Sequence, residues 1–399
     1  MLLYASLLVQ AGSLPGSTWV ALTVPPQAGK AGTLFGLAVD PANNQVLLAT
    51  TAASIVRSAD GGLSWRSVYT GKTAVTTVAF SPLKADLVLA GTQGSGAVGS
   101  RDGGRTWAPA TGLDGRTVRV FGFALTLFVA GTDRGVYASQ DGFAWTPSGL
   151  AGSSIDALAV EAVHAPVRLV AGSDAPGQGS SLVLFRSLDS GASWTQFSPP
   201  ISGTLAVRLS AGPLPPTGDT RPLVAGTNAG LFESTDNGST FTPLSGGDLL
   251  PSIDYTEVAF IADHYDRFYV ASDGGGSGSG GLWRTNDAGR TFTSLNPPVP
   301  SITALAVSNE DSPTLYVATF EPTDHTSALW AYHDTGGTPQ GPALQSSPVA
   351  SAGRTAPAGS GLGPFEFIKS AQFPYLLLGA AAVMVILAAM VAHLRGRRQ

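Results

Sequence analysis

The sequence predicts an all-β protein: a single seven-bladed β-propeller of four-stranded blades, followed by one C-terminal transmembrane helix. Three observations carry this prediction. An eight-residue motif recurs at steps of 39 to 51 residues, strand-like runs precede each copy, and an uncharged apolar run lies near the C-terminus. Repeats of about 40 to 50 residues are typical of propeller blades.

The recurring motif has the pattern Ser/Thr-x-Asp-x-Gly-x-Ser/Thr-aromatic. Full copies begin at Ser58, Ser100, Ser187, Ser234 and Thr285, and a shortened copy runs from Ser139 to Trp145. The Asp and the first Ser/Thr can bind backbone N–H groups of a turn, and the Gly permits a positive φ. The aromatic residue begins the next run and can pack between blades. The motif therefore predicts a hairpin between the third and fourth strands of each blade.

The composition agrees with many short strands and tight turns. The 399 residues include 50 Gly and 28 Pro, 43% are hydrophobic, and only 12% are charged. There is no Cys, which excludes disulfides and Cys-ligated metals. Four of the 22 basic residues and none of the 27 acidic ones lie in residues 369–399, so residues 1–368 carry about −9. This acidic body argues against nucleic-acid binding, which needs a basic face.

Apolar runs bounded by Gly, Pro, Asp or Ser predict three strands ahead of each motif. The first run of each unit is nearly continuous in apolar residues, as in strands that are buried on both faces. These first runs are 34–39, 75–80, 118–123, 155–160, 204–209, 255–260 and 302–307. The second run ends in a small-residue turn such as Leu89-Ala90-Gly91-Thr92.

The seventh unit lacks a fourth strand. Its motif dissolves after Tyr332-His333-Asp334-Thr335-Gly336. Ser17-Thr18-Trp19 resembles the end of a motif, and Val20-Ala21-Leu22 then resembles the missing strand. We predict that residues 17–24 complete blade seven beside 329–332, because ring closure removes unpaired strand edges. The propeller then spans residues 17–337.

The segments outside the propeller predict a protein that is anchored in a membrane. Residues 1–16 are either a weak signal peptide without its basic start or a disordered leader. Residues 338–370 are rich in Pro, Ala, Gly and Ser and are predicted to be a linker. Residues 371–394 include 18 uncharged apolar residues and predict a transmembrane helix, with a buried core helix as the alternative. The basic tail 395–399 would lie in the cytoplasm and the propeller outside the plasma membrane.

The motif resembles the Asp-box, also called the bacterial neuraminidase repeat. Propellers with this repeat occur in sialidases, xyloglucan-degrading glycosidases, sortilin-type receptors and photosystem II assembly factors. The resemblance implies a fold and no single activity. In such proteins the box lies at the blade periphery, away from the ligand. It therefore implies a structural rather than catalytic or calcium-binding role for Asp60, Asp102, Asp141, Asp189, Asp236 and Asp287.

Ligand-binding residues are expected on loops at the end opposite the boxes. Charged residues predicted there are Asp114, Arg116, Asp133, Arg134, Asp174, Asp248, Asp254, Asp273, Glu321, Asp324 and His325, with Arg119, Asp156 and Glu257 on innermost strands. The candidate ligand-binding set is Arg119, Asp133, Arg134, Asp156 and Glu257. Arg119 and Asp156 fall in successive blades, so they could simply pair with each other.

Two functions remain open. Asp156 and Glu257 could supply the acid and base of a glycosidase. The Arg-Ile-Pro motif that a sialidase resemblance would require does not occur, and xyloglucan-degrading enzymes usually pair two propellers. We therefore expect a non-catalytic binding or assembly scaffold for a protein or glycan, without cofactor or metal. A cell-surface glycoside hydrolase, xyloglucanase- or sialidase-like, is the alternative.

Overall fold

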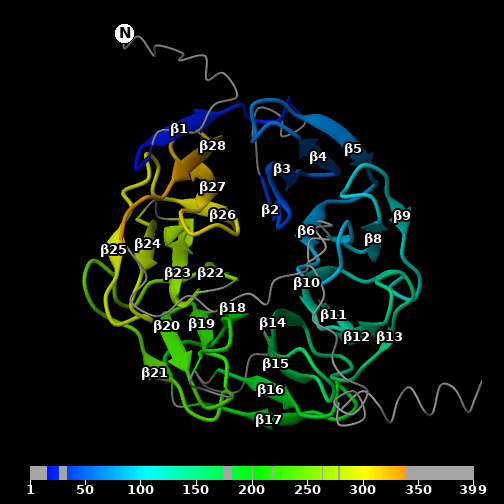
Figure 1. Cartoon of the computed structure of the whole chain (residues 1–399). Coiled ribbons are helices and arrows are strands. Elements are labelled where there is room, and N and C mark those ends of the chain that lie inside the picture. Colours follow the sequence, from blue (N-terminus) through cyan, green and yellow to red (C-terminus); the bar gives the residue numbers. More distant parts are fainter. Residues whose placement is uncertain are drawn as a thin grey trace, which may run out of the picture. The chain divides into compact units, whose positions relative to one another are not determined.

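The computed structural model describes residues 16–26, 34–173, 182–199, 201–216, 220–262, 264–276 and 279–337. These residues form seven antiparallel four-stranded sheets, each built from strands that follow one another in the chain, apart from one. First strands of neighbouring blades contact one another in a closed cycle (Figure 1). The predicted seven-bladed all-β propeller is therefore confirmed.

The strands take the same four positions in every blade. The innermost strands are β2 (Gly36–Asp40), β6 (Val75–Phe80), β10 (Val118–Phe123), β14 (Ile155–Ala162), β18 (Ala206–Ala211), β22 (Glu257–Ile261) and β26 (Ile302–Val307). The second strands are β3 (Asn43–Thr50), β7 (Val88–Thr92), β11 (Phe128–Thr132), β15 (Arg168–Ser173), β19 (Leu223–Thr227), β23 (His264–Ser272) and β27 (Thr314–Glu321).

The third strands are β4 (Ser54–Ser58), β8 (Ala97–Ser100), β12 (Gly135–Ser139), β16 (Leu184–Ser187), β20 (Gly230–Ser234), β24 (Gly281–Thr285) and β28 (Thr326–His333). The outer strands are β5 (Arg66–Thr70), β9 (Ala108–Pro109), β13 (Thr146–Pro147), β17 (Thr195–Phe197), β21 (Thr242–Pro243), β25 (Thr293–Ser294) and β1 (Trp19–Leu22). A short 3₁₀ turn, η2 (Gly274–Gly276), follows β23.

The N-terminal strand takes the position predicted for it. β1 pairs antiparallel with β28, with Trp19 opposite Tyr332 and Leu22 opposite Leu329. The Trp19 indole N–H donates to the Leu295 carbonyl of the preceding blade, at 2.9 Å. Blade seven therefore combines strands from both ends of the propeller sequence, and β1 fills the position of its fourth, outer strand.

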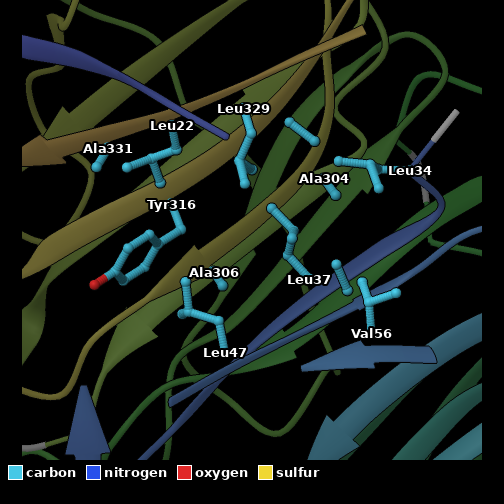
Figure 2. Close-up of a cluster of buried hydrophobic side chains, with 12 residues drawn as sticks. Leu22, Leu34, Leu37, Leu47, Val56, Ala304, Ala306, Tyr316, Leu329 and Ala331 are labelled. Atoms are coloured by element: carbon cyan, nitrogen blue, oxygen red, sulfur yellow. The ribbon is translucent and has the colours of Figure 1, made fainter. Parts of the chain in front are cut away.

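The hydrophobic core consists of seven clusters, one at each boundary between neighbouring blades. Figure 2 shows the cluster between blades seven and one, where Leu22 and Tyr316 face Leu37 and Leu47. The motif aromatics pack at these boundaries, as predicted; Trp145, for example, is 3% exposed between blades two and three. The blades thus hold one another through shared cores.

The small residues predicted as a turn lie inside the ends of the second strands, where they have a packing reason. A Cβ added at Gly91 would lie 2.5 Å from the Val118 carbonyl oxygen, and one at Gly226 would lie 2.3 Å from that of Tyr255. Both carbonyls belong to the chain at the innermost strand of the next blade. Glycine therefore permits neighbouring blades to approach at backbone contact distance.

Each motif folds as a hydrogen-bonded turn, called the repeat turn below. In the copy at residues 100–107, the Gly104 amide donates to Ser100 Oγ at 2.9 Å. Asp102 Oδ1 accepts the Thr106 amide at 2.9 Å, and Asp102 Oδ2 accepts the Thr106 hydroxyl at 2.6 Å. The same pattern surrounds Asp60, Asp189, Asp236 and Asp287, and the shortened turn uses Asp141. All six aspartates therefore stabilise turns between third and fourth strands.

These bonds predict an acid-dependent contribution to stability. Burial acts to raise the pKa of Asp102, but hydrogen bonds from Thr106, Ser100 and Arg105 lower it to about 2. An unfolded aspartate titrates near pH 4, so the bonds stabilise the fold above about pH 4 and are lost as the pH falls toward 2. Asp102→Asn should lower the urea midpoint at pH 7, and the difference from wild type should shrink from pH 4 to pH 2. A difference that stays constant with pH would contradict this.

The described residues include no helix with the length and hydropathy to cross a membrane. The predicted leader, linker, transmembrane helix (371–394) and tail lie outside them.

Candidate functional site

Two of the predicted site residues occupy the same structural position in neighbouring blades. The innermost strands β10 and β14 each contain a register shift against their second strand, between Val118 and Val120 and between Ile155 and Ala157. Arg119 and Asp156 are the extra residues at these bulges. A β-bulge re-aims a side chain out of the strand alternation. Arg119 Nη1 forms an ion pair with Asp156 Oδ1 across the boundary of blades three and four.

A second ion pair joins blades five and six, although its residues are not at bulges. Arg208 Nη2 on β18 lies 3.2 Å from Glu257 Oε2 on β22. Glu257 was predicted as a candidate, but Arg208 was missed. Its signal was available in the sequence, because Arg208 precedes Glu257 by one blade just as Arg119 precedes Asp156. Four consecutive innermost strands therefore carry charges of alternating sign.

The pairing decides what the two carboxylates can do. Asp156 and Glu257 lie on first strands two blades apart, and each is bound to a different arginine. Burial raises the pKa of Glu257, and the Arg208 charge opposes this. Because each carboxylate already has a cationic partner, the structure does not bring them together as a free acid and base.

Replacement of Arg208 should show how strongly Glu257 depends on its cationic partner. Arg208→Met leaves Glu257 without a cation, so its pKa should rise further and the variant should lose about 1–2 kcal/mol at pH 7. A carboxyl whose pKa is higher in the folded than in the unfolded protein destabilises the fold once the pH exceeds its unfolded pKa. Below that pH it is protonated in both states and has no such effect. The loss should therefore shrink between pH 7 and pH 4.5 in urea denaturation, whereas Arg208→Met/Glu257→Gln should show a smaller, pH-independent loss. An equal loss at both pH values in the single variant would contradict this reasoning.

The loops between second and third strands lie at the end of the propeller opposite the repeat turns, because successive strands are antiparallel. This end is called the loop end below. Here Asp133 Oδ1 accepts the Thr117 amide at 3.0 Å and so holds the loop ahead of β10. Arg116 Nε donates to the Tyr137 hydroxyl at 3.0 Å. The Arg134 side chain is exposed, with no ion-pair partner within the part of the chain described. Of the predicted ligand-binding residues, Arg134 is the one most available to a ligand.

Two aspartates lie close together at the same end of blade six. Asp254 precedes β22 and Asp273 follows β23, and Asp254 Oδ1 accepts the Ser272 hydroxyl at 3.1 Å. Burial, followed by a hydrogen bond between the two carboxyls, raises the pKa of Asp273. Closely spaced carboxyls are used in acid–base chemistry. Both residues were predicted at this end, but their pairing was not.

The other predicted residues are spread over several loops. Asp248 Oδ2 accepts the Ser294 amide at 3.0 Å, Glu321 accepts the Thr323 amide, and Asp324 accepts the Thr326 amide. His325 packs edge-on against Phe320, and Asp114 is exposed. Asp174 lies outside the described residues. Among the residues described, no three His, Asp or Glu side chains are placed to hold a metal ion.

The chain is similar in sequence to one glycan-degrading enzyme. It is 27% identical over 276 residues to a xyloglucanase of Hypocrea jecorina (strain QM6a), covering 66% of this chain and 31% of that enzyme. The chain thus spans about a third of the length of this curated relative. No protein-family profile matches the chain.

Solved structures of two kinds share the fold. The GH74 xyloglucanase of Xanthomonas campestris matches with a TM-score of 0.55 at 15% identity, over 79% of this chain and 56% of that one. YCF48 of Cyanidioschyzon merolae matches with a TM-score of 0.53 at 16% identity, over 79% of this chain and 98% of that one. A structure of YCF48 bound to D1 peptide gives 0.55 at 15% identity, over 81% and 99%. At such identities these likenesses show the propeller fold alone.

Proposed function

We propose that this protein is a non-catalytic binding or assembly module that presents the loop end of its propeller to a protein or glycan ligand. The observation that carries this proposal is the pairing of both candidate carboxylates, Asp156 with Arg119 and Glu257 with Arg208. A general acid or base needs access to substrate and a pKa matched to its task. Carboxylates that form ion pairs with arginines on neighbouring innermost strands are instead held in place as part of a polar surface.

The likeness in fold to a peptide-binding protein supports a binding role. YCF48, whose structure was determined with a bound D1 peptide, is matched over 99% of its length. A single propeller of this size is thus sufficient to bind a peptide in one protein of the same fold. In this proposal the repeat turns are Asp-boxes, and they serve the scaffold rather than the ligand.

The proposal includes a membrane anchor. Residues 371–394 would cross the plasma membrane, with residues 395–399 in the cytoplasm and the propeller held outside by residues 338–370. The full chain should then remain in the membrane fraction after alkaline carbonate extraction, and a variant without 371–399 should become soluble. Release of the full chain by carbonate would contradict the anchor.

A surface glycoside hydrolase is the second candidate. It is favoured by the similarity to a xyloglucanase and by the neighbouring carboxyls of Asp254 and Asp273 at the loop end. The full chain in detergent should be assayed on xyloglucan and on a panel of fluorogenic glycosides. We expect no turnover. Turnover that is lost in Asp156→Asn, Glu257→Gln or Asp273→Asn would overturn the binding role and establish the hydrolase.

The binding role has a direct test on peptide and glycan arrays. Arg134→Ala removes an exposed loop-end cation, and Arg66→Ala removes an exposed cation on the outer strand β5. We expect array ligands whose affinity falls in Arg134→Ala and is unchanged in Arg66→Ala. Equal effects of the two substitutions would contradict a loop-end site.

A further inference from the structure

A cavity of about 330 Å³ lies between blades five and six, at the end of the propeller that carries the repeat turns. Its walls are mostly apolar and come from Pro215, Pro222, Leu244 and the ring of Tyr265. The charged residues that line it are Glu233 on β20 and Arg290 in the repeat turn of blade six. This volume is at the lower end of the range of small-ligand sites.

Other blades have an arginine where blade five has Glu233. The residue before the first Ser/Thr of the motif is Arg57 in blade one, Arg186 in blade four and Arg284 in blade six. The strand register confirms that these positions correspond. In each of these blades and in blade five, the first Ser/Thr of the motif pairs with one residue of the second strand, and the residue before it pairs with the next one along the chain: Leu48, Val170, Val224 and Tyr269. Blade five is thus the only blade with an acid at this position.

Two of these three arginines bind the motif residues of the next blade. Arg57 Nε donates to the Gly103 carbonyl at 3.0 Å. Arg284 Nη1 donates to Asp334 Oδ1 at 2.6 Å. At these two boundaries, a guanidinium of the chain itself therefore occupies the space between the third strand and the neighbouring motif.

At the boundary of blades five and six, Glu233 places a hydrogen-bond acceptor where the arginines of blades one and six place a donor. Ala288 follows Asp287 as Gly103 follows Asp102, and both have a positive φ, 56° and 68° respectively. The Glu233 carboxylate cannot donate to a carbonyl at that turn, and it is shorter than an arginine. Arg290 is the charged group that acts on Glu233, yet it is exposed and forms no ion pair with it in the described part of the chain.

We propose that this cavity binds the guanidinium group of an arginine side chain from a partner protein, which takes the place of the arginine that blade five lacks. Glu233 would accept the two N–H groups of the guanidinium fork, the geometry that arginine and carboxylate favour. Pro215, Pro222 and Leu244 would cover the aliphatic stem, and Tyr265 offers a ring face to the cation. The site is distinct from the loop end, which lies at the opposite end of the blades.

The ionisation of Glu233 sets the expected pH dependence. Burial raises the pKa of Glu233 to about 7, and the Arg290 charge opposes this. Arg290 and Tyr265 are the other titratable side chains that line the cavity. A cation binds the carboxylate form, so affinity should increase from pH 6 to pH 8 as Glu233 loses its proton.

The test uses the full chain in detergent and n-butylguanidinium as the probe, followed by calorimetry or by NMR shifts. N-butylurea, which is neutral and of the same shape, is the matched control ligand. We expect n-butylguanidinium to bind and butylurea to bind at least tenfold more weakly. Glu233→Gln should weaken binding about 10- to 100-fold, as expected for loss of hydrogen bonds to a charged group. Arg290→Gln should strengthen it.

A second variant separates binding from folding. Glu233→Arg reproduces the residue found in blades one, four and six, and should retain the thermal stability of the wild type while it abolishes probe binding. Absence of n-butylguanidinium binding to the wild type, or unchanged affinity in Glu233→Gln, would overturn the site. The pentapeptide Gly-Gly-Arg-Gly-Gly should bind at least as tightly as the free probe. Binding of the free probe alone would overturn the partner-protein assignment.

Discussion

Asp334→Asn should lower the free energy of unfolding by about 3–5 kcal/mol, the cost of breaking a buried ion pair. Asp334 is fully buried. Its Oδ2 accepts Arg267 Nη2 at 3.0 Å and the Tyr269 hydroxyl at 2.7 Å, and its Oδ1 accepts Arg284 Nη1 at 2.6 Å. Burial raises the pKa of Tyr269, so its phenol keeps the proton that it donates. Asparagine would leave two arginines without a counter-ion between blades six and seven.

The measurement is urea denaturation of the full chain in detergent, with tryptophan fluorescence as the readout. Asp114→Asn is the control, because Asp114 is exposed and its substitution should change the free energy of unfolding by less than about 0.5 kcal/mol. Asp236→Asn tests the corresponding aspartate of an intact repeat turn, where neutral Ser234 and Thr240 are the side-chain partners. An effect of Asp334→Asn no larger than that of Asp236→Asn would show that the buried cluster is not stabilising.

Deletion of residues 1–24 should have the second large effect. The deletion removes β1, which leaves β28 with an unpaired edge and takes Leu22, 8% exposed, out of the core between blades seven and one. It also removes the Trp19 contact with Leu295 and the Thr23 carbonyl that accepts the Trp65 indole N–H at 2.8 Å. Loss of one leucine from a core alone costs about 2–5 kcal/mol, so the truncated protein should unfold at a much lower temperature or aggregate through its exposed strand edge.

A peptide of residues 16–26 provides the control for this deletion. Added in trans, it should pair with β28 and raise the melting temperature of the truncated protein, as expected for strand addition to an open edge. A peptide with Trp19 and Leu22 replaced by Ala should fail to do so. An unchanged melting temperature after deletion would show that the ring is stable without β1.

Local chemistry explains why so much of the fold could be predicted. The bonds of a repeat turn connect residues two to four positions apart, as from Ser100 to Asp102 and from Asp102 to Thr106, so the pattern itself specifies the turn. Apolar runs between turns predict strands, and β6, β10 and β26 have the predicted bounds. The ends of other strands differ by a few residues, because cross-strand pairing rather than composition decides where a strand ends.

The site was predicted only in part. Glu257 and Asp156 were identified as inner-strand charges, but the partner Arg208 was not. Asp254 and Asp273 were placed at the correct end, but their contact with each other was not predicted. Each of these contacts crosses between strands or blades, and the contact of Arg119 with Asp156 also depends on bulges, which composition does not reveal.

The sequence by itself determined the number of blades, the course of their strands, the repeat turns and the strand that closes the ring. These features repeat, and each depends on a few neighbouring residues. Only the tertiary structure decided the roles of Asp334, Arg208 and Glu233. Asp334 occupies the motif position of the turn aspartates, yet Tyr332 stands where a Ser or Thr would bind it, and two arginines of blade six bind it instead. A side chain between blades takes its role from the neighbour that folding places opposite it, and that neighbour lies tens of residues away in the chain.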